Sequence, residues 1–451
     1  MPADSAPRAA SPQDSNLGDD RADWVHDHLG TEEKGLLEED SRWFFHQCLS
    51  TPCLNAVRRV EGIYLEDLSG RRYMDFHGNN VHHLGYAHPK LVAALKAQLD
   101  DLVFAPRRYT NRFSVELART MASLAGGALD KCLFAPSGSD AMEIALRIVR
   151  GATGRHKTIS FVDSFHGAGF GAASLSGDAL FRDSLLGPPL PGAVHVRPPR
   201  DGLVDASLSE IHEAFERERE IAAVIACPMA PSEYIPPARF WEEVQQLCRH
   251  SGALLVFDEI PWGLGKTGAM FSWQHHGVVP DIMVTGKALG GGVVPIACVS
   301  AREELDRFGG LAIGHYTHEK NPFAAAAALA TIRIIQDEGL VERAASLGEL
   351  ALHMAGDLTR RHRLVSAARG KGLVLGLDLG PPAESGVRPH EAAGRLFYKA
   401  LQRGLSAKAS AGALALSPPL VVTRQELERA FDILDESLAE LDAEIFAGRP
   451  S

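Results

Sequence analysis

Lys287 is the residue whose type and surroundings point most directly to chemistry. An apolar run at residues 282–285 leads into Gly286, Lys287 and a glycine stretch that ends at Gly292. A lysine amine held in such a turn can form a Schiff base with an aldehyde cofactor. The segment therefore predicts covalent catalysis through the Lys287 amine.

Asp258 is the acidic counterpart of this lysine. It ends a second apolar run, at residues 253–257. A carboxylate in that place suits the nitrogen of a pyridine ring, because its charge keeps the nitrogen protonated and lets the ring accept electrons. Taken alone, Asp258 is equally suited to capping the next segment of the chain. Together, Asp258 and Lys287 indicate a pyridoxal-phosphate (PLP) enzyme.

Ser137, Gly138 and Ser139 form a small-residue turn between an apolar run and a helical pattern at residues 140–149. The backbone N–H groups and the positive dipole end of a helix bind phosphate well. Alone, such a turn is more often a plain helix cap. Its place upstream of Asp258 and Lys287 favours binding of the cofactor phosphate.

Phe165 and His166 follow another apolar run, at residues 158–162. Open α/β sheets bind ligands at the carboxyl ends of their strands, so we expect Phe165 to stack on the pyridine ring there. A core position is the common alternative for an aromatic residue beside a strand.

A polar loop at residues 77–83 contains Asn79, Asn80 and three histidines. We expect Asn79 and Asn80 to line the substrate pocket, although a simply solvated loop fits the sequence as well. The histidines lack a matching set of further ligands, so the sequence predicts no metal site.

The elements that must position these residues alternate in type along the chain. Strand-like runs separated by helical patterns occur at residues 131–134, 158–162, 222–226, 254–257, 282–285 and 296–299. Such alternation predicts an α/β fold with a mainly parallel sheet covered by helices. A strand candidate at 372–378 and helical patterns at 389–403 and 423–445 predict a smaller α+β domain.

The domain organisation follows from these patterns. Residues 1–35 are rich in Asp, Ser, Pro and Ala, which predicts a flexible tail. We expect residues 36–80 to contribute to the small domain, 81–333 to form the large cofactor-binding domain, and 334–451 to form the small C-terminal domain. A helical pattern at 322–358 leads out of the large domain.

Composition limits the partners and the location. The formal net charge is −11 and no long basic block occurs, which excludes nucleic acid and anionic membranes as expected partners. No run of about 18 apolar residues and no signal-length apolar segment occurs, so nothing anchors the chain in a membrane. The six cysteines lack disulfide or metal-site spacing, which predicts free thiols in the cytoplasm.

Beyond these patterns, the sequence resembles the class III PLP-dependent aminotransferases over about residues 42–445. The resemblance is carried by the segments 137–139, 165–167, 257–260, 265–268, 285–290, 317–322 and 369–373. It implies a fold-type I enzyme, usually a homodimer with both active sites at the interface. Thr317 would then reach the cofactor phosphate of the neighbouring subunit.

The resemblance also implies a role for each matching residue. Gly138 and Ser139 would bind the phosphate, Phe165 and Ile260 would cover the two faces of the ring with His166 beside it, Asp258 would pair with the ring nitrogen, and Lys287 would carry the cofactor. Lys287 would also move the proton between the substrate carbon and the cofactor. Arg369 matches an arginine that binds the substrate carboxylate.

Two positions depart from the family pattern. Cys227 stands where many members have a glutamate that pairs with the arginine matching Arg369, and Pro261 replaces a glutamine that hydrogen-bonds the cofactor. We therefore expect Arg369 to lack its usual shield and to require a substrate that carries a carboxylate, phosphate or phosphonate. Cys227 would line the substrate site.

Three functions remain open at this point. The first is transfer of an amino group between an anionic amine or amino acid and a keto acid. The second is an ammonia-lyase or racemase, since segments 76–83, 104–108 and 314–321 are similar to a subgroup that includes the (R)-1-hydroxy-2-aminoethylphosphonate ammonia-lyases. The third is a non-catalytic relative. The sequence does not identify the amine, the acceptor or the stereochemistry.

Overall fold

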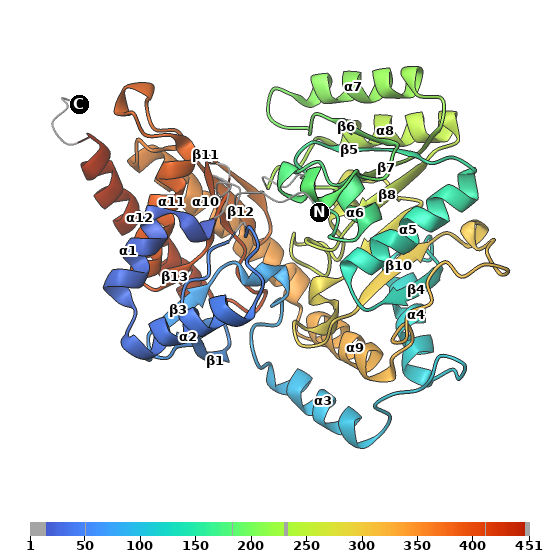
Figure 1. Cartoon of the computed structure of the whole chain (residues 1–451), viewed down its shortest axis with the longest axis horizontal. Coiled ribbons are helices and arrows are strands. Elements are labelled where there is room, and N and C mark those ends of the chain that lie inside the picture. The colour runs from blue at the N-terminus through green and yellow to red at the C-terminus, as the bar shows by residue number, and fades with distance from the viewer. Residues whose placement is uncertain (1–14, 50, 183, 230–232, 411, 447–451) are drawn as a thin grey trace, which may run out of the picture.

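The central feature of the computed structural model, which describes residues 15–49, 51–182, 184–229, 233–410 and 412–446, is a seven-stranded sheet (Figure 1). Its strand order is β4-β10-β9-β8-β7-β5-β6. The bounds are β4 Lys131–Ala135, β5 Lys157–Phe161, β6 Ala193–Val196, β7 Ile221–Ala226, β8 Leu254–Asp258, β9 Ile282–Thr285 and β10 Ala297–Ala301. The fold is α/β, as predicted.

The direction of the strands decides where their ends meet. Strands β5 to β9 are paired in parallel. Strand β10 is antiparallel to both of its neighbours, β9 and β4. Two antiparallel steps restore the original direction, so β4 points the same way as β9. The carboxyl ends of β4, β5, β7, β8 and β9 therefore lie along one edge of the sheet.

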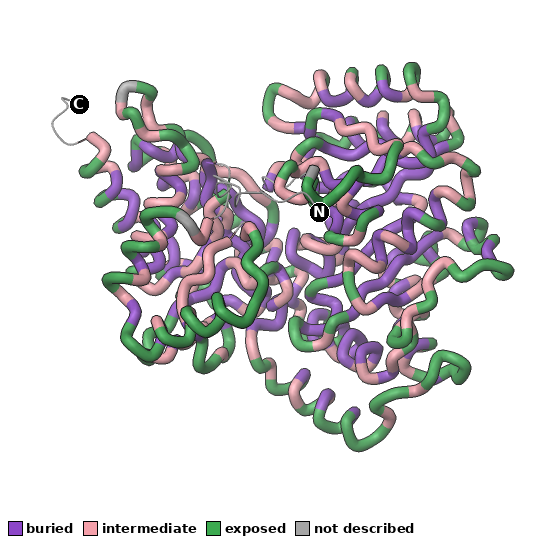
Figure 2. The backbone as a smooth tube through the Cα atoms, viewed as in Figure 1, coloured by how far each residue is buried: buried purple, intermediate pink, exposed green. Residues whose placement is uncertain are grey.

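Both faces of this sheet are buried (Figure 2). Along β8, Leu255 and Phe257 belong to one hydrophobic cluster and Val256 belongs to the other. Helices α5 and α6 pack on the Val256 face, and helices α4, α7, α8 and α9 pack on the other. Their bounds are α4 Arg112–Leu124, α5 Gly138–Thr153, α6 Phe170–Leu175, α7 Val204–Arg217, α8 Ala238–Ser251 and α9 Pro322–Asp337. Burial on both faces explains the continuous apolar runs that the sequence shows.

A smaller α+β half contains two four-stranded sheets, β1-β2-β3-β13 and β11-β12-β15-β14. The strands are β1 Val57–Glu61, β2 Tyr64–Asp67, β3 Arg72–Asp75, β11 Val365–Lys371, β12 Val374–Leu379, β13 Leu405–Ser406, β14 Lys408–Ser410 and β15 Ala413–Leu416. The remaining helices are α1 Asp19–His28, α2 Thr31–Trp43, α3 Pro89–Asp100, α10 Leu340–Arg361, α11 Pro389–Gln402 and α12 Arg424–Phe446. Parallel pairing of β13 with β3 joins residues from the two ends of the chain. Across the described residues, every helix is too short or too polar to cross a bilayer.

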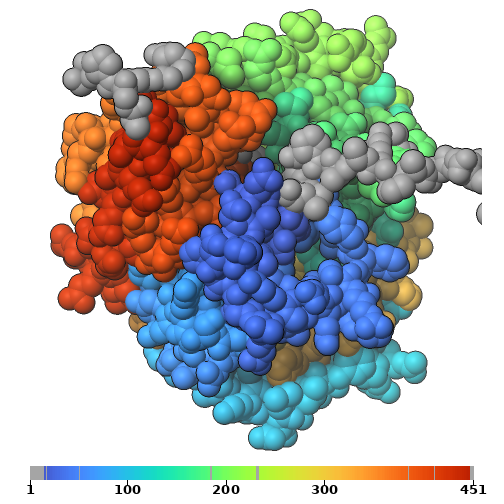
Figure 3. Space-filling view, turned by 60° about the vertical axis from the view of Figure 1, so that its left-hand side comes forward, coloured from blue at the N-terminus to red at the C-terminus, as the bar shows by residue number. Residues whose placement is uncertain are grey.

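The predicted flexible tail is wrong for the part that the structure describes. Residues 19–28 and 31–43 form helices α1 and α2, and α1 packs against α11, so that the N-terminal region lies beside the C-terminal part of the chain (Figure 3). Trp24 is buried and donates a 2.8 Å hydrogen bond from Nε1 to Asn55 Oδ1. One buried tryptophan in a polar segment anchors the first helix without producing an apolar pattern. Residues 1–14 lie outside the described part.

The helical pattern at residues 322–358, predicted as one unit, forms two helices in the structure, α9 and α10. They are separated by Gly339, which adopts a φ of 59°. Glycine takes this left-handed conformation at little cost, so it ends one helix and starts the next in a new direction.

Candidate active site

Five of the predicted residues are brought to the same edge of the large sheet by the strands that precede them. Ser137 follows β4, Phe165 follows β5 and Cys227 follows β7, while Asp258 ends β8 and Lys287 follows β9. The register pairs Asp258 with Val284, close to the end of the neighbouring strand. Residues far apart in the sequence thus form one site at the carboxyl edge, where α/β sheets bind ligands.

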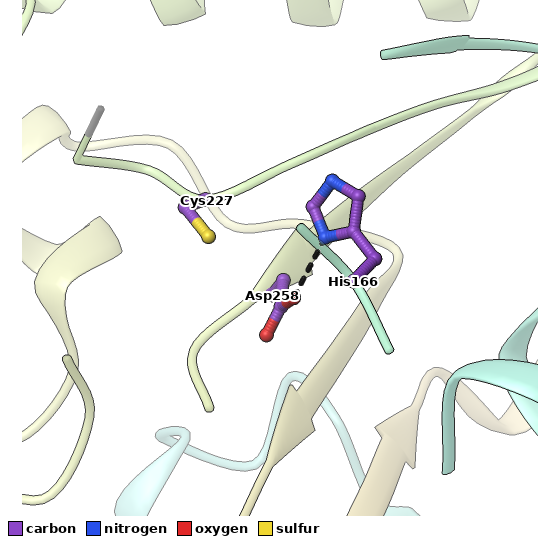
Figure 4. A group of neighbouring side chains, drawn as sticks. All are labelled: His166, Cys227 and Asp258. Atoms are coloured by element: carbon purple, nitrogen blue, oxygen red, sulfur yellow. Dashed lines mark hydrogen bonds and ion pairs between the residues drawn. The ribbon is translucent and has the colours of Figure 1, made fainter. Parts of the chain in front are cut away.

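Asp258 is held by two hydrogen bonds at the end of its strand. Its side chain is buried, and Oδ2 accepts a 2.7 Å bond from His166 Nδ1 (Figure 4). Oδ1 accepts a 3.0 Å bond from the Ile260 amide. These bonds fix the direction of the carboxylate. The opposite ring nitrogen, His166 Nε2, is buried without a partner among the described residues. A preoriented buried anion is the group that a pyridinium nitrogen requires.

Lys287 lies in a turn of unusual backbone conformation. Its φ is 45°, in the left-handed region that non-glycine residues seldom adopt. Solvent reaches the side chain, yet protein atoms surround the amine on most sides. The resulting loss of hydration lowers the pKa of Lys287, and Asp258 opposes this shift. A lysine amine that loses its proton more readily is suited to nucleophilic attack and proton transfer.

The turn after β4 starts helix α5 and offers backbone donors. Ser137 is the N-cap, since its Oγ accepts a 3.1 Å bond from the Asp140 amide. Gly138 and Ser139 form the first helical turn, and Ser139 Oγ accepts a 3.0 Å bond from the Ala168 amide. This bond ties the turn after β4 to the turn after β5. The N-terminus of a long helix beside a lysine and a buried carboxylate fits a phosphate group.

Gly167 allows these two turns to approach each other. Its φ is 134°, and a Cβ atom there would lie 2.7 Å from Ser139 Oγ and 2.9 Å from Ser139 Cα. We expect Gly167→Ala to weaken PLP binding by about fivefold to a hundredfold, because strain and a backbone clash of this kind cost ~1–3 kcal/mol. Titration of the apoprotein with PLP, followed by visible absorption, measures the effect. Gly154→Ala is the control, since Gly154 also has a left-handed φ but nothing within 4 Å; equal PLP affinity of the two variants would contradict the prediction.

Ile260 lies between the phosphate turn and the lysine turn. A Cβ on Gly138 would lie 2.8 Å from Ile260 Cδ1, and a Cβ on Gly286 would lie 3.5 Å from Ile260 Cγ1. Glycine at both positions lets the Ile260 side chain lie close to both turns. An apolar side chain here suits one face of a planar ring. These residues, with Asp258 and Lys287, fit PLP.

Phe165 and Thr317 are both exposed in the single chain. The Phe165 ring packs against Phe181, with ring centroids 4.2 Å apart. Thr317 lies in the segment between β10 and α9, where its side chain remains open to solvent. Both side chains are available to a ligand or to a second subunit.

The loop at residues 77–83 contacts several parts of the site. Asn80 is buried and its Oδ1 accepts a 2.6 Å bond from Ser417, whereas Asn79 is exposed. His82 and His83 each bond a backbone oxygen, on Asp75 and Gly263. Ser417 thus holds the carbonyl side of the Asn80 amide, while Asn79 remains accessible to a ligand.

Cys227 lies with Asp258 and His166, and its sulfur points toward the carboxylate (Figure 4). One potential ligand atom from each residue lies within 4.8 Å of the others. Burial and the nearby negative charge of Asp258 raise the pKa of the Cys227 thiol well above its usual value. A neutral thiol beside a hydrogen-bonded His–Asp pair is a poor metal site, so the cofactor explains the cluster better.

Arg369 is not left without an anion, contrary to the expectation from Cys227. It lies in β11, where Nη1 donates a hydrogen bond to Asp378 Oδ2, and the buried Glu233 lies near the same guanidinium. A Cβ on Gly376 would lie 3.0 Å from Glu233 Oε2 and 3.4 Å from Arg369 Nη2. Asp378 therefore supplies an anion to Arg369 although Cys227 stands in place of the glutamate.

Two residues near the site were missed by the sequence reasoning, Glu233 and Lys408, and His77 of the polar loop lies near them. Lys408 interacts electrostatically with Lys287, His77 and Glu233. Burial lowers the pKa of His77 to about 4, so the ring is neutral at ordinary pH, and its Nε2 is buried without a described partner. A carboxylate shortly after a strand was a usable signal for Glu233, but nothing in the sequence distinguishes Lys408 from a surface lysine.

Comparison with known proteins gives consistent similarities over most of the chain. The family model of aminotransferase class III matches residues 47–438. The (R)-1-hydroxy-2-aminoethylphosphonate ammonia-lyase of Vibrio splendidus (strain 12B01) is 34% identical, over 95% of each protein. Acetylornithine aminotransferase of Methanosarcina acetivorans is 30% identical, over 89% of this chain and 96% of the relative. A solved amine transaminase from an uncultivated Pseudomonas species, in a PLP-bound form, is 27% identical with a TM-score of 0.82, covering 88% of this chain and 99% of its own.

Proposed function

The chain belongs to the aminotransferase class III family and is a PLP-dependent enzyme, and from this premise we propose that it transfers an amino group between an anionic amine or amino acid and a keto acid. One observation carries the proposal. A buried, doubly hydrogen-bonded Asp258 and an amine of lowered pKa, Lys287, face the same edge of the large sheet. This pair supplies the anion and the base that PLP chemistry requires.

Each residue has a defined part in this proposal. When bound, PLP supplies an aldehyde that condenses with amines and a ring that withdraws electrons from the substrate carbon. Asp258 holds a negative charge beside the ring nitrogen, and His166 orients that carboxylate. Lys287 carries the cofactor in the resting enzyme. Its Nζ then transfers the proton between the substrate carbon and the cofactor. Ser137 starts the helix that presents the amides of Gly138 and Ser139 to the phosphate, and Ile260 covers one ring face.

The remaining assignments concern the substrate and the second subunit. Arg369 binds the anionic group of the substrate. The substrate pocket is lined by Asn79, Asn80 and Cys227. We propose a homodimer in which Thr317 completes the partner's phosphate site and Phe165 covers the second ring face. Exposed apolar side chains support a covered surface; they include Phe104, Phe170, Val293 and Leu311. The six cysteines lack disulfide-framework spacing, which supports a cytoplasmic location.

Ammonia elimination from a hydroxy-aminophosphonate is the second candidate function. Identity to the phosphonate ammonia-lyase is 34% over 95% of the chain, compared with 30% over 89% for acetylornithine aminotransferase. An elimination acts on a single substrate, so it needs no second substrate to enter the site. Cys227, a neutral thiol beside Asp258, is compatible with either reaction.

The two reactions give different products from one amine. For transfer, we expect one equivalent of amine to convert the cofactor to its amino form, which only a keto acid restores. For elimination, ammonia is released over many turnovers without an acceptor. Cofactor absorbance and ammonia are measured in the same sample, with candidate aminophosphonates, ω-amino acids and α-amino acids as substrates. Repeated ammonia release without a keto acid would contradict the primary proposal and support the lyase.

A further inference from the structure

His77 is a polar ring that lies near the reactive lysine with one nitrogen unsatisfied. Its Nε2 is buried and has no hydrogen-bond partner among the described residues. The ionisable groups that face the ring are Asp75 on β3, His82 of the same loop, Lys287 after β9 and Lys408 on β14. A buried polar atom without a partner is costly, so this nitrogen is suited to a ligand that completes its hydrogen bonding.

The backbone of the polar loop fixes the place of the His77 ring. Asp75 Oδ1 accepts a 2.9 Å bond from the His77 amide and a 3.0 Å bond from the Gly78 amide. The next residues, Gly78, Asn79 and Asn80, have φ values of 43°, 47° and 59°. Left-handed backbone is strained for the two asparagines, and such strain persists only where the surroundings hold the conformation. His77 therefore begins a tightly constrained turn.

The same loop packs against both turns between which the cofactor ring would lie. A Cβ on Gly292, in the glycine stretch after Lys287, would lie only 2.9 Å from the carbonyl oxygen of Val81. His83 Nε2 lies 3.0 Å from the carbonyl oxygen of Gly263, in the segment after β8. Glycine at position 292 thus lets the loop approach the lysine turn. The polar loop is fixed to the turns after β8 and β9.

The chemistry of PLP leaves one of its polar groups without a partner in the site as described so far. PLP carries a phosphate, a ring nitrogen, an aldehyde and, next to the aldehyde, a phenolic oxygen. The turn after β4, Asp258 and Lys287 account for the phosphate, the nitrogen and the aldehyde. The phenolic oxygen adjoins the aldehyde carbon, so it must lie near Lys287. Pro261, in the segment after Asp258, has neither an N–H nor a polar side chain to offer this oxygen.

We propose that His77 Nε2 donates a hydrogen bond to the phenolic oxygen of bound PLP. This inference rests on the proposed function and adds a cofactor-binding residue to it. The bond stabilises negative charge on the phenolic oxygen. It thereby weakens the hold of that oxygen on the proton that it shares with Lys287 Nζ when the cofactor is attached.

The His77 ring can act as a donor without changing its own charge. Burial lowers the pKa of His77 to about 4, Lys408 and Lys287 lower it further, and Asp75 opposes them. A neutral imidazole carries one N–H, which is the donor that the phenolic oxygen needs. Between about pH 6 and pH 10 the ring stays neutral, so a spectral change in that range belongs to the proton of the cofactor.

The experiment is a pH titration of the visible absorption band of the PLP-loaded enzyme. Without the donor, the phenolic oxygen holds the shared proton more tightly. We therefore expect the midpoint of the titration to rise by about one to two pH units in His77→Leu. Titration of the apoprotein with PLP should show a roughly tenfold loss of affinity in the same variant. His77→Gln can place its amide nitrogen where Nε2 lies, and it should keep the midpoint within about half a unit of wild type.

His276→Leu is the matched control. Burial also lowers the pKa of His276 to about 4, and its Nε2 is likewise buried without a described partner. The ionisable group beside His276 is His275 rather than the reactive lysine. We expect this variant to keep the wild-type midpoint, whatever its melting temperature.

The inference is overturned if His77→Leu keeps the wild-type midpoint or if His276→Leu shifts it equally. A raised KM with an unchanged midpoint would mean that His77 contacts only the substrate, which also overturns it. Should His77→Leu not fold, His77→Asn decides, because its shorter amide cannot reach the Nε2 position and the same rise is expected. Failure of the proposed function is separate, since it would appear as a wild-type protein without the visible band of bound PLP.

Discussion

Replacement of Lys287 by alanine is expected to reduce turnover by at least about 10³-fold, because one side chain supplies both the covalent attachment and the proton transfer. The turn around Lys287 lies on a buried strand end, and its glycines remain in the variant. The fold should therefore survive while the chemistry is lost. Steady-state rates with a reactive amine, together with thermal unfolding, separate these two outcomes.

Lys266→Ala is an instructive comparison for this variant. Lys266 is a second buried lysine, and burial lowers its pKa to about 7, but its Nζ donates to the carbonyl oxygens of Ser417 and Pro418. We expect the loss of the Lys266 side chain to lower stability rather than to abolish the bound-cofactor spectrum.

A Lys287→Ala enzyme that retains more than about a tenth of wild-type turnover would contradict the role given to Lys287.

Asp258→Asn is expected to lower kcat by roughly 10²-fold or more, since removal of one preorganised electrostatic partner has effects of this size. The amide keeps an oxygen that accepts the Ile260 hydrogen bond, so the backbone at the end of β8 should hold its position. The variant loses the negative charge and the pairing with His166. Turnover, PLP affinity and the melting temperature are measured on one preparation.

Glu259→Gln is the matched control for this second variant. Glu259 is also buried at the end of β8, where its carboxylate accepts bonds from Ser272 and the Trp273 amide. Burial raises the pKa of Glu259 to about 7, and the group faces structural donors rather than the site. Its loss should reduce stability with turnover largely kept. Equal kcat losses in the two variants would mean that Asp258 acts only through local structure.

Much of the site was predictable because parallel strands carry a strong signal. Each of β4, β5, β7, β8 and β9 is an apolar run that leads into polar or small residues, and the carboxyl edge of such a sheet brings those residues together. Asp258 and Lys287 meet for this reason. Strand β6 at Ala193–Val196 was missed because it is short, lies at the sheet edge and is only partly buried.

Charge placement between distant elements was not predictable in the same way. Glu233, Arg369 and Lys408 come from a loop, from β11 and from β14, and no local pattern records that they meet. The sequence therefore led to an Arg369 without a shield, since only position 227 was considered. The structure supplies Asp378 and Glu233 instead.

The N-terminal helices illustrate a further limit. Helices α1 and α2 are polar, and α1 gains stability by packing against α11 in the C-terminal part through residues such as Trp24. Tertiary packing rather than local propensity determines such helices. A composition typical of a disordered tail therefore misled the prediction.

The most direct test of the central claim is to identify the amine that carries the cofactor. Reduction of the PLP-loaded enzyme with borohydride fixes the cofactor covalently to that amine, and peptide mapping by mass spectrometry locates it. The account predicts a single modified peptide containing Lys287, absent from Lys287→Ala. Modification of Lys266, Lys408 or another lysine in its place, or no modification of a protein that shows the visible PLP band, would contradict it.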